Sequence, residues 1–410
     1  MIDWLACTLV KAVGALLCRL PPEFAVWLGE RMGLLAYWLQ PKRRKIGFIN
    51  LRAAFGDELT PAQAKRIMRS CFKQLGAGML ELLRLPVMDE AYIDRYVTVE
   101  GLRHFEQAIA SGRPVIMLTG HYGSWELCSI AGALKGYSVV ALARAQEKLP
   151  KLYRLLVSYR ESKGCTIIHK GGGIRRLVAA LEAKRLVGIV GDQVSRQGLF
   201  TEFFGRPALF ATGPFELAYS RQALVLPIFN HRVRGPYHRI VIEPPIDGSR
   251  HPTKAEAARE GVELFAAALA RHIAEDPGQW LWMHKRWKHT PARSALVLSD
   301  GKLGHVKQSL AAVQALRDLH PATTHEVVEI RYRHPMARAL ALGWSWALPR
   351  WGAAWCLRAT LQPGSADALL SRTADVIVSC GAATLPANVL WARANGARSV
   401  AIMKPAPLPL

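Results

Sequence analysis

Short apolar runs alternate with amphipathic helical patterns through the middle of the chain. Strand-like runs occupy residues 114–120, 137–144, 165–170, 186–193 and 224–233. Helical periodicity separates the first four of these runs, and residues 22–85 before them carry apolar side chains at helical spacing. Continuous apolar strands that alternate with helices are typical of an α/β sheet with parallel strands. The pattern therefore predicts such a sheet, preceded by a helical segment.

The N-terminus carries a separate apolar segment. Residues 4–20 are apolar apart from Thr8, Lys11 and Arg19. A helix of this length, at ~1.5 Å per residue, barely crosses a hydrocarbon layer of ~30 Å. Two prolines and a glutamate follow it instead of a small-residue cleavage site, which favours a retained anchor over a removed signal peptide. A short tilted span and a helix lying in the membrane interface both fit, and a buried soluble helix is the alternative.

A second α/β unit begins near Pro291. The segment 279–294 is aromatic and basic, and after it the strand pattern restarts at residues 295–301, followed by a helical pattern and three further apolar runs. At 410 residues the chain exceeds the usual size of one hydrophobic core. We therefore expect a membrane anchor helix at residues 1–21, an α/β domain at 22–290 and a second α/β unit at 291–410.

The charge balance points to anionic surfaces or substrates. The formal net charge is +23, from 54 Lys and Arg against 31 Asp and Glu. The basic run Lys42–Lys45 follows the N-terminal helical segment. By the positive-inside tendency, such a run belongs on the cytoplasmic side of a membrane. Trp280, Trp282 and Trp287 stand among basic residues, a mixture that suits a membrane interface and also occurs in nucleic-acid binders. The 7 cysteines include no CxxC pair, which favours reduced thiols in a cytosol-facing protein.

The stretch GHYGSWE carries the strongest candidate chemistry. It follows the predicted strand at residues 114–120 and therefore lies at the carboxyl end of a parallel strand, where open α/β sheets bind ligands. Glycines 120 and 123 permit a tight turn, and Ser124 can cap the next helix. Positions five apart in a continuous helix lie about 140° apart, so a turn must bring His121 and Glu126 together. The carboxylate would then fix one imidazole nitrogen while the other takes a proton from a substrate hydroxyl.

On spacing alone, a surface histidine in a βα loop is the simpler interpretation of this stretch. A serine or cysteine hydrolase has little support, because the chain carries no GxSxG elbow.

Six blocks in order give this motif a context, and together they run from the N-terminal segment to about Lys288. They are Lys42–Thr60, Gly120–Glu126, Arg160–Ile168, Gly191–Gln193, Phe203–Ala218 and Gln279–Lys288. In these blocks the chain resembles the late acyltransferases of bacterial lipid A biosynthesis, within the lysophospholipid acyltransferase superfamily. The resemblance implies an acyltransferase-type mixed sheet flanked by helices. It also implies transfer of a fatty acyl chain from acyl-ACP or acyl-CoA to a hydroxyl of a lipid A precursor or related glycolipid, at the cytoplasmic side of the bacterial inner membrane.

The resemblance implies that His121 is the general base and that Glu126 orients it. Further candidates for substrate binding come from residue type and from their place at strand ends. They are Arg144, Arg160, Asp192, Gln193, Phe204 and Gly205. The two arginines suit phosphates of a glycolipid or of the donor's phosphopantetheine, and the Phe-Gly pair suits an apolar wall for an acyl chain. The alternatives are a surface role in solubility for the two arginines, a buried cap for Asp192 and Gln193, and a plain core loop for Phe204 and Gly205. Ala145 and Gly56 stand where the family often has proline.

No metal or cofactor is expected for this reaction beyond the acyl thioester as co-substrate. The expected partners are inner-membrane lipids, acyl carrier protein and a glycolipid acceptor, with no nucleic acid. The alternative is a non-catalytic basic protein that binds membrane or nucleic acid through a degenerate acyltransferase domain.

Residues after 291 carry a separate resemblance. The loop with Gly301, Gly304 and His305 lies between a predicted strand and a helix, and the blocks Ser379–Ala387 and Gly396–Pro405 follow. In these blocks the segment is similar to the first half of the mitochondrial-fission-type, glycosyltransferase-like family. The resemblance implies a Rossmann-like α/β half-domain at residues 291–410. Because the donor nucleotide in such enzymes binds mainly to the second half, independent glycosyl transfer is not expected, and a partner-binding module is the simpler interpretation.

Overall fold

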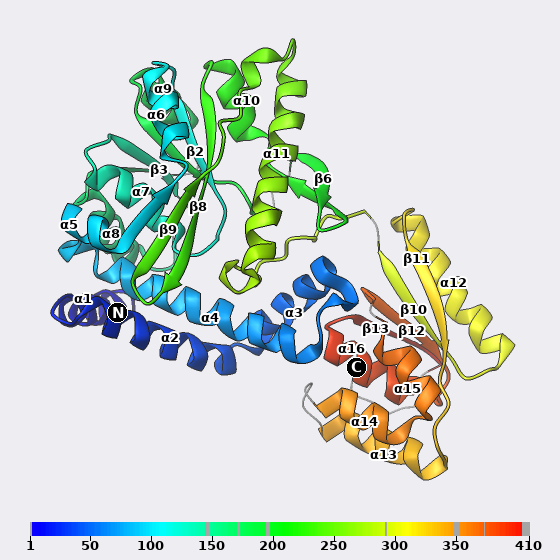
Figure 1. The fold of residues 1–410 in the computed structure, drawn as a ribbon. Helices are drawn as coiled ribbons and strands as arrows, with labels where there is room; N and C mark the ends of the chain where they lie inside the picture. Colours follow the sequence, from blue (N-terminus) through cyan, green and yellow to red (C-terminus); the bar gives the residue numbers. More distant parts are fainter. Residues whose placement is uncertain are drawn as a thin grey trace. The chain divides into compact units, whose positions relative to one another are not determined.

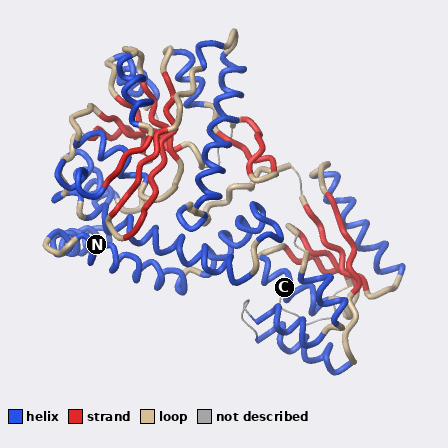
Figure 2. The backbone as a smooth tube through the Cα atoms, viewed as in Figure 1, coloured by secondary structure: helices blue, strands red, loops and turns tan. Residues whose placement is uncertain are grey.

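The computed structural model describes residues 2–143, 147–169, 173–193, 197–291, 293–347, 352–372 and 374–403. The chain forms two compact units (Figures 1 and 2). The first comprises Met1–Pro41, Lys65–Phe203 and Ala208–Arg286. The second comprises Lys42–Ala64, Phe204–Pro207 and Trp287–Leu410. The basic run at residues 42–45 is thus part of the second compact unit.

A seven-stranded mixed sheet forms the centre of the first unit, in the order β1-β9-β8-β2-β5-β3-β4. Its strands are β1 (Val97–Glu100), β2 (Val115–Thr119), β3 (Val139–Ala143), β4 (Cys165–His169), β5 (Leu186–Val190), β8 (Leu224–Arg234) and β9 (Tyr237–Ile242). Neighbouring strands are parallel except β8 and β9, which pair antiparallel. The five runs predicted as strands are β2, β3, β4, β5 and β8, so both the strand predictions and the mixed sheet are confirmed. A separate hairpin pairs β6 (Leu199–Phe203) with β7 (Arg206–Phe210).

Helices cover both faces of this sheet. They are α4 (Pro61–Leu83), α5 (Glu90–Tyr96), α6 (Leu102–Ala110), α7 (Trp125–Leu134), α8 (Pro150–Glu161), α9 (Ile174–Glu182), α10 (Gly213–Ser220) and α11 (Lys254–Glu275). Alternate residues of a strand point to opposite faces, and Val115 and Met117 of β2 enter a core cluster with Phe105 and Ile130. On the opposite face, Phe229 stacks on Phe265 of α11 with ring centroids 6.1 Å apart. Burial on both faces explains why these strands are apolar throughout.

Two N-terminal helices of the first unit, α1 (Ile2–Cys18) and α2 (Pro22–Leu39), pack against the rest of that unit through one side. Leu17 and Ala25 are buried with Leu80 and Leu83 of α4. The other side of both helices remains apolar and exposed, with Leu9 65% and Leu35 58% accessible. Among the described residues, no helix combines the length and apolar character needed to cross a bilayer.

The second unit contains a four-stranded parallel sheet in the order β11-β10-β12-β13. Its strands are β10 (Ser294–Ser299), β11 (Thr324–Glu329), β12 (Val376–Cys380) and β13 (Arg398–Ile402). Its helices are α3 (Pro41–Phe55), α12 (Leu303–Leu319), α13 (Pro335–Ala347), α14 (Ala353–Thr360), α15 (Pro363–Leu370) and α16 (Leu385–Asn395). All four strands predicted after Pro291 are present, and the parallel sheet agrees with the expected α/β half-domain.

The loop after β10 contains the glycines singled out in the sequence. Gly301 has a φ of +83°, and His305 on α12 lies with its Nδ1 2.9 Å from an oxygen of Asp300. A phosphate or sugar ligand for this loop stays a prediction.

Candidate active site

The carboxyl ends of β2 and β5 bring His121 and Asp192 together. The two strands are parallel neighbours, with Thr119 opposite Val190, so the chain leaves both at the same sheet edge. His121 Nδ1 lies 2.6 Å from Asp192 Oδ1, and the backbone N–H of His121 donates to Asp192 Oδ2 at 2.8 Å. Because an ionised carboxylate only accepts hydrogen bonds, Nδ1 carries the proton and Nε2 keeps its lone pair. The arrangement leaves a basic nitrogen at the ligand edge of the sheet.

Asp192 is fully buried and accepts a third N–H donor, the indole Nε1 of Trp280, at 2.8 Å on Oδ2. Burial alone would raise the pKa of Asp192, but the charge of His121 and the hydrogen bonds that His121 donates hold it well below its usual range. For His121, burial acts to lower the pKa, and the charges of Asp192 and Glu126 outweigh it, so the pKa lies above the ordinary 6.5. The carboxylate therefore stays ionised and makes the imidazole beside it more basic.

A short antiparallel bridge fixes the turn that carries His121. Gly123 donates its backbone N–H to the Gln279 carbonyl at 3.0 Å, and Leu281 donates to the His121 carbonyl at 3.0 Å. Gly123 has a φ of +55°, and a Cβ there would lie 1.9 Å from the carbonyl oxygen of Asn230. The predicted turn role of this glycine is confirmed, and only glycine fits the position.

Glu126 differs from expectation in its partner. Its two carboxylate oxygens accept from Arg160 Nε at 2.8 Å and from Arg160 Nη2 at 2.7 Å. A third guanidinium nitrogen, Nη1, donates to the Leu156 carbonyl at 3.1 Å. Glu126 lies in the first turn of α7 and faces α8, whereas Asp192 enters from the neighbouring strand. The hydrogen bond to the imidazole, assigned to Glu126 from the motif, is therefore made by Asp192.

Ser124 also has a different partner than expected. It occupies the N-cap position of α7, but its hydroxyl donates to Glu81 Oε2 at 3.1 Å instead of capping the helix. Glu81 is buried and accepts from Arg232 Nη1 at 2.7 Å, and it lies 2.9 Å from His238 Nε2. Burial alone would raise the pKa of Glu81, but Arg232 and His238 hold it below its usual range. This buried cluster ties α4 to β8, β9 and the start of α7.

The remaining candidate residues divide between two places. Gln193 lies at the imidazole, with its amide nitrogen 3.1 Å from His121 Nε2, so the amide donates to the free lone pair. Phe204 and Gly205 form the turn of the β6–β7 hairpin with φ of +55° and +66° and belong to the second unit. Arg144 lies outside the described residues.

The three tryptophans assigned to a membrane interface are buried instead. Trp280 and Trp282 have no accessible surface, and Trp287 is 6% exposed. Trp280 packs edge-on against Phe203 and Trp282, and Trp282 donates its indole N–H to the Pro277 carbonyl at 2.6 Å. The rings of Trp280 and Trp282 complete the protein core beside the active site, so the interface interpretation of this segment was wrong.

A cavity of about 80 Å³ lies beside the Glu126–Arg160 pair, which contributes charged groups to its lining, and Thr119 and Ser129 add hydroxyls. The apolar part comes from strands β2, β3, β4, β5 and β8 and from α7, and it includes Met117, Cys128, Ile130, Ala141, Ile167 and Ile228. A polar pair at the edge of an apolar cavity matches the usual anatomy of a small-molecule site. The cavity therefore offers space for an apolar part of a ligand.

These features define an α/β enzyme with a carboxylate-held imidazole at the ligand edge of its sheet. The chain belongs to the bacterial lipid A biosynthesis acyltransferase family, whose model matches residues 1–289. The chain is therefore an acyltransferase. Residues 290–410 lie outside the part that matches the family model.

Characterised relatives agree with this assignment. The phosphatidylinositol mannoside acyltransferase of Mycobacterium tuberculosis is 25% identical over 231 residues, which cover 54% of this chain and 70% of the relative. The lipid A biosynthesis palmitoleoyltransferase of Escherichia coli is 25% identical over 278 residues, covering 67% of this chain and 88% of the relative. The lipid A biosynthesis lauroyltransferase of Escherichia coli is 22% identical over 284 residues, covering 67% and 89%.

Proposed function

We propose that this protein is a membrane-associated O-acyltransferase in which His121 is the general base. The imidazole Nε2 takes the proton of an acceptor hydroxyl while the oxygen attacks the thioester carbonyl of the acyl donor. The new C–O bond forms, the C–S bond breaks, and the leaving thiolate takes its proton from the imidazolium. The observation that carries this proposal is the 2.6 Å contact between His121 Nδ1 and Asp192, which leaves the lone pair of the neutral ring on Nε2.

Asp192 acts in this proposal as the positioning residue for the base. Its three N–H donors fix the carboxylate, and the carboxylate fixes the tautomer of His121 and stabilises the imidazolium that forms during transfer. Gln193 covers Nε2 in the structure, so the acceptor hydroxyl displaces its amide when it binds.

The Glu126–Arg160 pair serves as a second element of the site. The guanidinium is held on three sides by Glu126 and Leu156, so its role is to fix Glu126 rather than to bind a free phosphate. Glu126 keeps a negative charge near His121, which favours the imidazolium. The adjacent apolar cavity receives the part of the acyl chain next to the thioester.

The acceptor is proposed to be a glycolipid hydroxyl and the donor acyl-ACP or acyl-CoA. The relatives named for phosphatidylinositol mannoside and for lipid A both act on glycolipids, which supports this class of acceptor. The net charge of +23 favours a substrate or surface that carries phosphate groups. Mass spectrometry of lipids from a deletion strain identifies the acceptor and the acyl length together, as one missing acyl mass.

Membrane association is proposed to run through the exposed faces of α1 and α2, with the catalytic domain on the cytoplasmic side of the inner membrane. Trp4, Leu9, Trp27 and Leu35 are each 47% or more exposed, and such apolar helix faces bind at the lipid interface. Replacing both Trp27 and Leu35 by serine should reduce flotation with anionic vesicles. Unchanged flotation of this double variant would argue against these helices as the contact.

The mechanism is tested by purifying His121→Ala and Glu126→Ala and measuring acyl transfer to a lipid A precursor. Loss of His121 should reduce transfer by about 10²–10⁴-fold, the usual contribution of a general base. His251→Ala is a matched control, because His251 pairs with Glu260 through a surface contact. Near-full transfer by both folded variants would remove the mechanism.

A further inference from the structure

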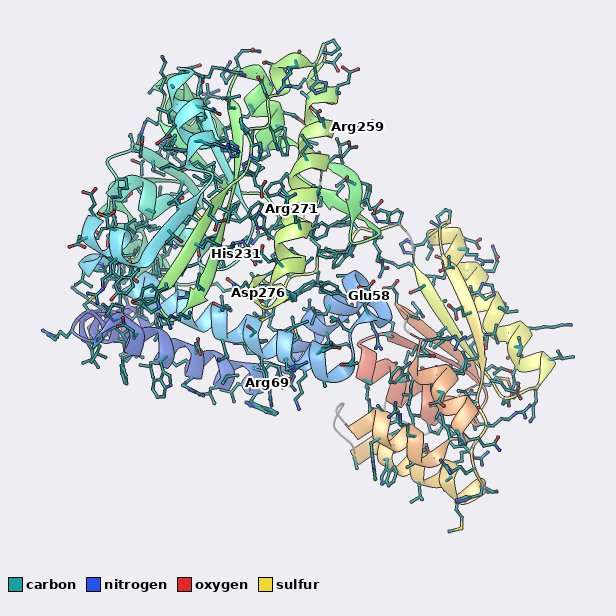
Figure 3. The ribbon with its side chains drawn as sticks, in the orientation of Figure 1. Glu58, Arg69, His231, Arg259, Arg271 and Asp276 are labelled. Atoms are coloured by element: carbon teal, nitrogen blue, oxygen red, sulfur yellow. The ribbon has the colours of Figure 1, made fainter. Side chains whose placement is uncertain are left out.

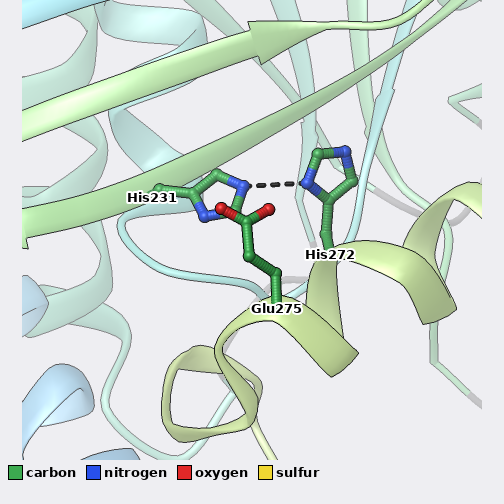
Figure 4. A group of neighbouring side chains, drawn as sticks. All are labelled: His231, His272 and Glu275. Carbon is green, nitrogen blue, oxygen red and sulfur yellow. Dashed lines mark hydrogen bonds between the residues drawn. The ribbon is translucent and has the colours of Figure 1, made fainter.

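Two buried histidines outside the active site face one another between β8 and the last turns of α11. His231 comes from β8 and His272 from α11, and Figure 3 places His231 beside the helix end that carries Arg271. His231 Nε2 and His272 Nδ1 are 2.8 Å apart, and the carboxylate of Glu275 lies next to them (Figure 4). One ligand atom from each of these three residues lies within 4.8 Å of the other two. Three donor atoms of the kinds that bind transition metals thus lie close together.

The outer nitrogens of the two rings have polar partners. His272 Nε2 lies 2.7 Å from Glu243 Oε1, and His231 Nδ1 lies 3.1 Å from the Tyr122 hydroxyl. A histidine that binds a metal commonly donates its other N–H to a carboxylate or oxygen in this way. Both rings are buried, and these two contacts hold their outer nitrogens.

We propose that His231 Nε2, His272 Nδ1 and the Glu275 carboxylate form a binding site for a transition-metal ion such as Zn²⁺, with water as the fourth ligand. Two imidazoles and one carboxylate with an open fourth position are a known ligand set for zinc, whereas Mg²⁺ and Ca²⁺ prefer oxygen ligands. With metal–nitrogen bonds of about 2.0–2.1 Å, tetrahedral ligands lie about 3.3 Å apart, so the two ring nitrogens separate by only about 0.5 Å.

Metal binding requires two local changes. The proton that now lies between the rings moves from Nε2 to Nδ1 of His231, and no net proton is lost. The Tyr122 hydroxyl, which now donates to Nδ1, turns so that its oxygen accepts a hydrogen bond from the new Nδ1–H. Glu275 turns from its ion pair with Arg239, which keeps Glu100 as a partner at 3.4 Å. The ion would then hold the end of α11 to β8 beside Tyr122, the residue after the proposed base. Its role is structural, and the acyl-transfer step does not pass through it.

The test is metal binding by the full-length protein after treatment with a chelator. Titration with Zn²⁺ and Co²⁺ should give one tight site, a raised melting temperature and a visible Co²⁺ absorption typical of low coordination number. Glu275→Gln should weaken binding at least ten-fold, and His272→Asn should abolish the tight site. Glu263→Gln is the matched control, because Glu263 is an exposed glutamate on the same helix.

Glu275→Gln keeps the test decisive if the buried His272→Asn variant fails to fold, since the Glu275 side chain is 51% exposed. The proposal is overturned if the wild type shows no tight site, or if Glu275→Gln and Glu263→Gln bind the metal as strongly as the wild type. X-ray absorption of the Co²⁺ form should show two imidazole ligands. A shell of oxygen ligands alone would place the ion elsewhere and would equally overturn the site.

Discussion

Replacing Asp192 by asparagine changes one charge and should reverse the tautomer of His121. Asp192 Oδ2 accepts two N–H groups, from the His121 backbone and from the Trp280 indole, each at 2.8 Å. In the Asp192→Asn variant the side-chain carbonyl oxygen has to stay on these two donors, because the alternative places an NH₂ group against both. The amide nitrogen then faces His121 Nδ1 and donates to it. The ring proton moves to Nε2, and the lone pair needed by the acceptor hydroxyl is lost.

The expected loss follows from this geometry. A histidine in the wrong tautomer loses general-base catalysis, which contributes about 10²–10⁴-fold, so kcat should fall by about 10³-fold with KM little changed. The assay measures thiol release from an acyl-CoA in the presence and absence of a glycolipid acceptor, beside circular dichroism to verify folding. A folded Asp192→Asn variant that keeps more than a fifth of wild-type kcat would refute the assignment. So would a large rise in KM alone, since that would make Asp192 a binding residue.

Three further predictions concern the neighbouring charges. Glu126→Gln removes a charge near His121 but keeps an oxygen for Arg160, so kcat/KM should fall about ten-fold. A loss as large as that of His121→Ala would contradict this secondary role. The rate should rise with pH and reach half its maximum above pH 6.5, because the raised pKa of His121 keeps the ring protonated below that point, and a midpoint below 6.5 would count against the Asp192 contact. Glu81→Gln breaks a buried pair with Arg232 and should lower the free energy of unfolding in urea by about 3–5 kcal/mol. Because the folded pKa of Glu81 is depressed, its contribution to stability is present above the ordinary carboxyl range and is lost as pH falls; a variant with wild-type acid sensitivity would refute this.

The sheet could be predicted from the sequence because its strands are buried on both faces. Runs such as 114–120 and 186–193 are apolar at nearly every position, and short continuous apolar runs between helical patterns indicate parallel strands. The order of the strands could not be predicted in this way. β2 pairs with β5 and β8, which lie about 70 and 110 residues further along the chain, and nothing in local periodicity encodes that pairing.

The residues of the candidate site could be proposed from the sequence, but the contacts between them could not. His121 and Asp192 both follow strands and were both candidates, yet their contact depends on β2 and β5 being neighbours. The burial of Trp280 and Trp282 was missed because aromatic and basic composition has the same appearance at a membrane interface and in a core. For the His121–Asp192 contact the sequence did hold a signal. One predicted strand ends at a histidine and another ends at an acid, and that pairing could have been proposed for testing.

The two carboxylates near His121 show how surroundings divide roles between chemically similar groups. Asp192 is fully buried, accepts three N–H donors and contacts the ring, so it cannot release its charge without leaving those donors unpaired. Glu126 is 37% exposed at its side chain, and Arg160 balances its charge, so it acts on the ring only through the field between them. The spacing of histidine and glutamate in the motif therefore reflects a shared turn and helix start rather than a direct contact. In the structure Asp192 makes the contact with the ring, and comparing the Asp192 and Glu126 variants tests which acid orients the base.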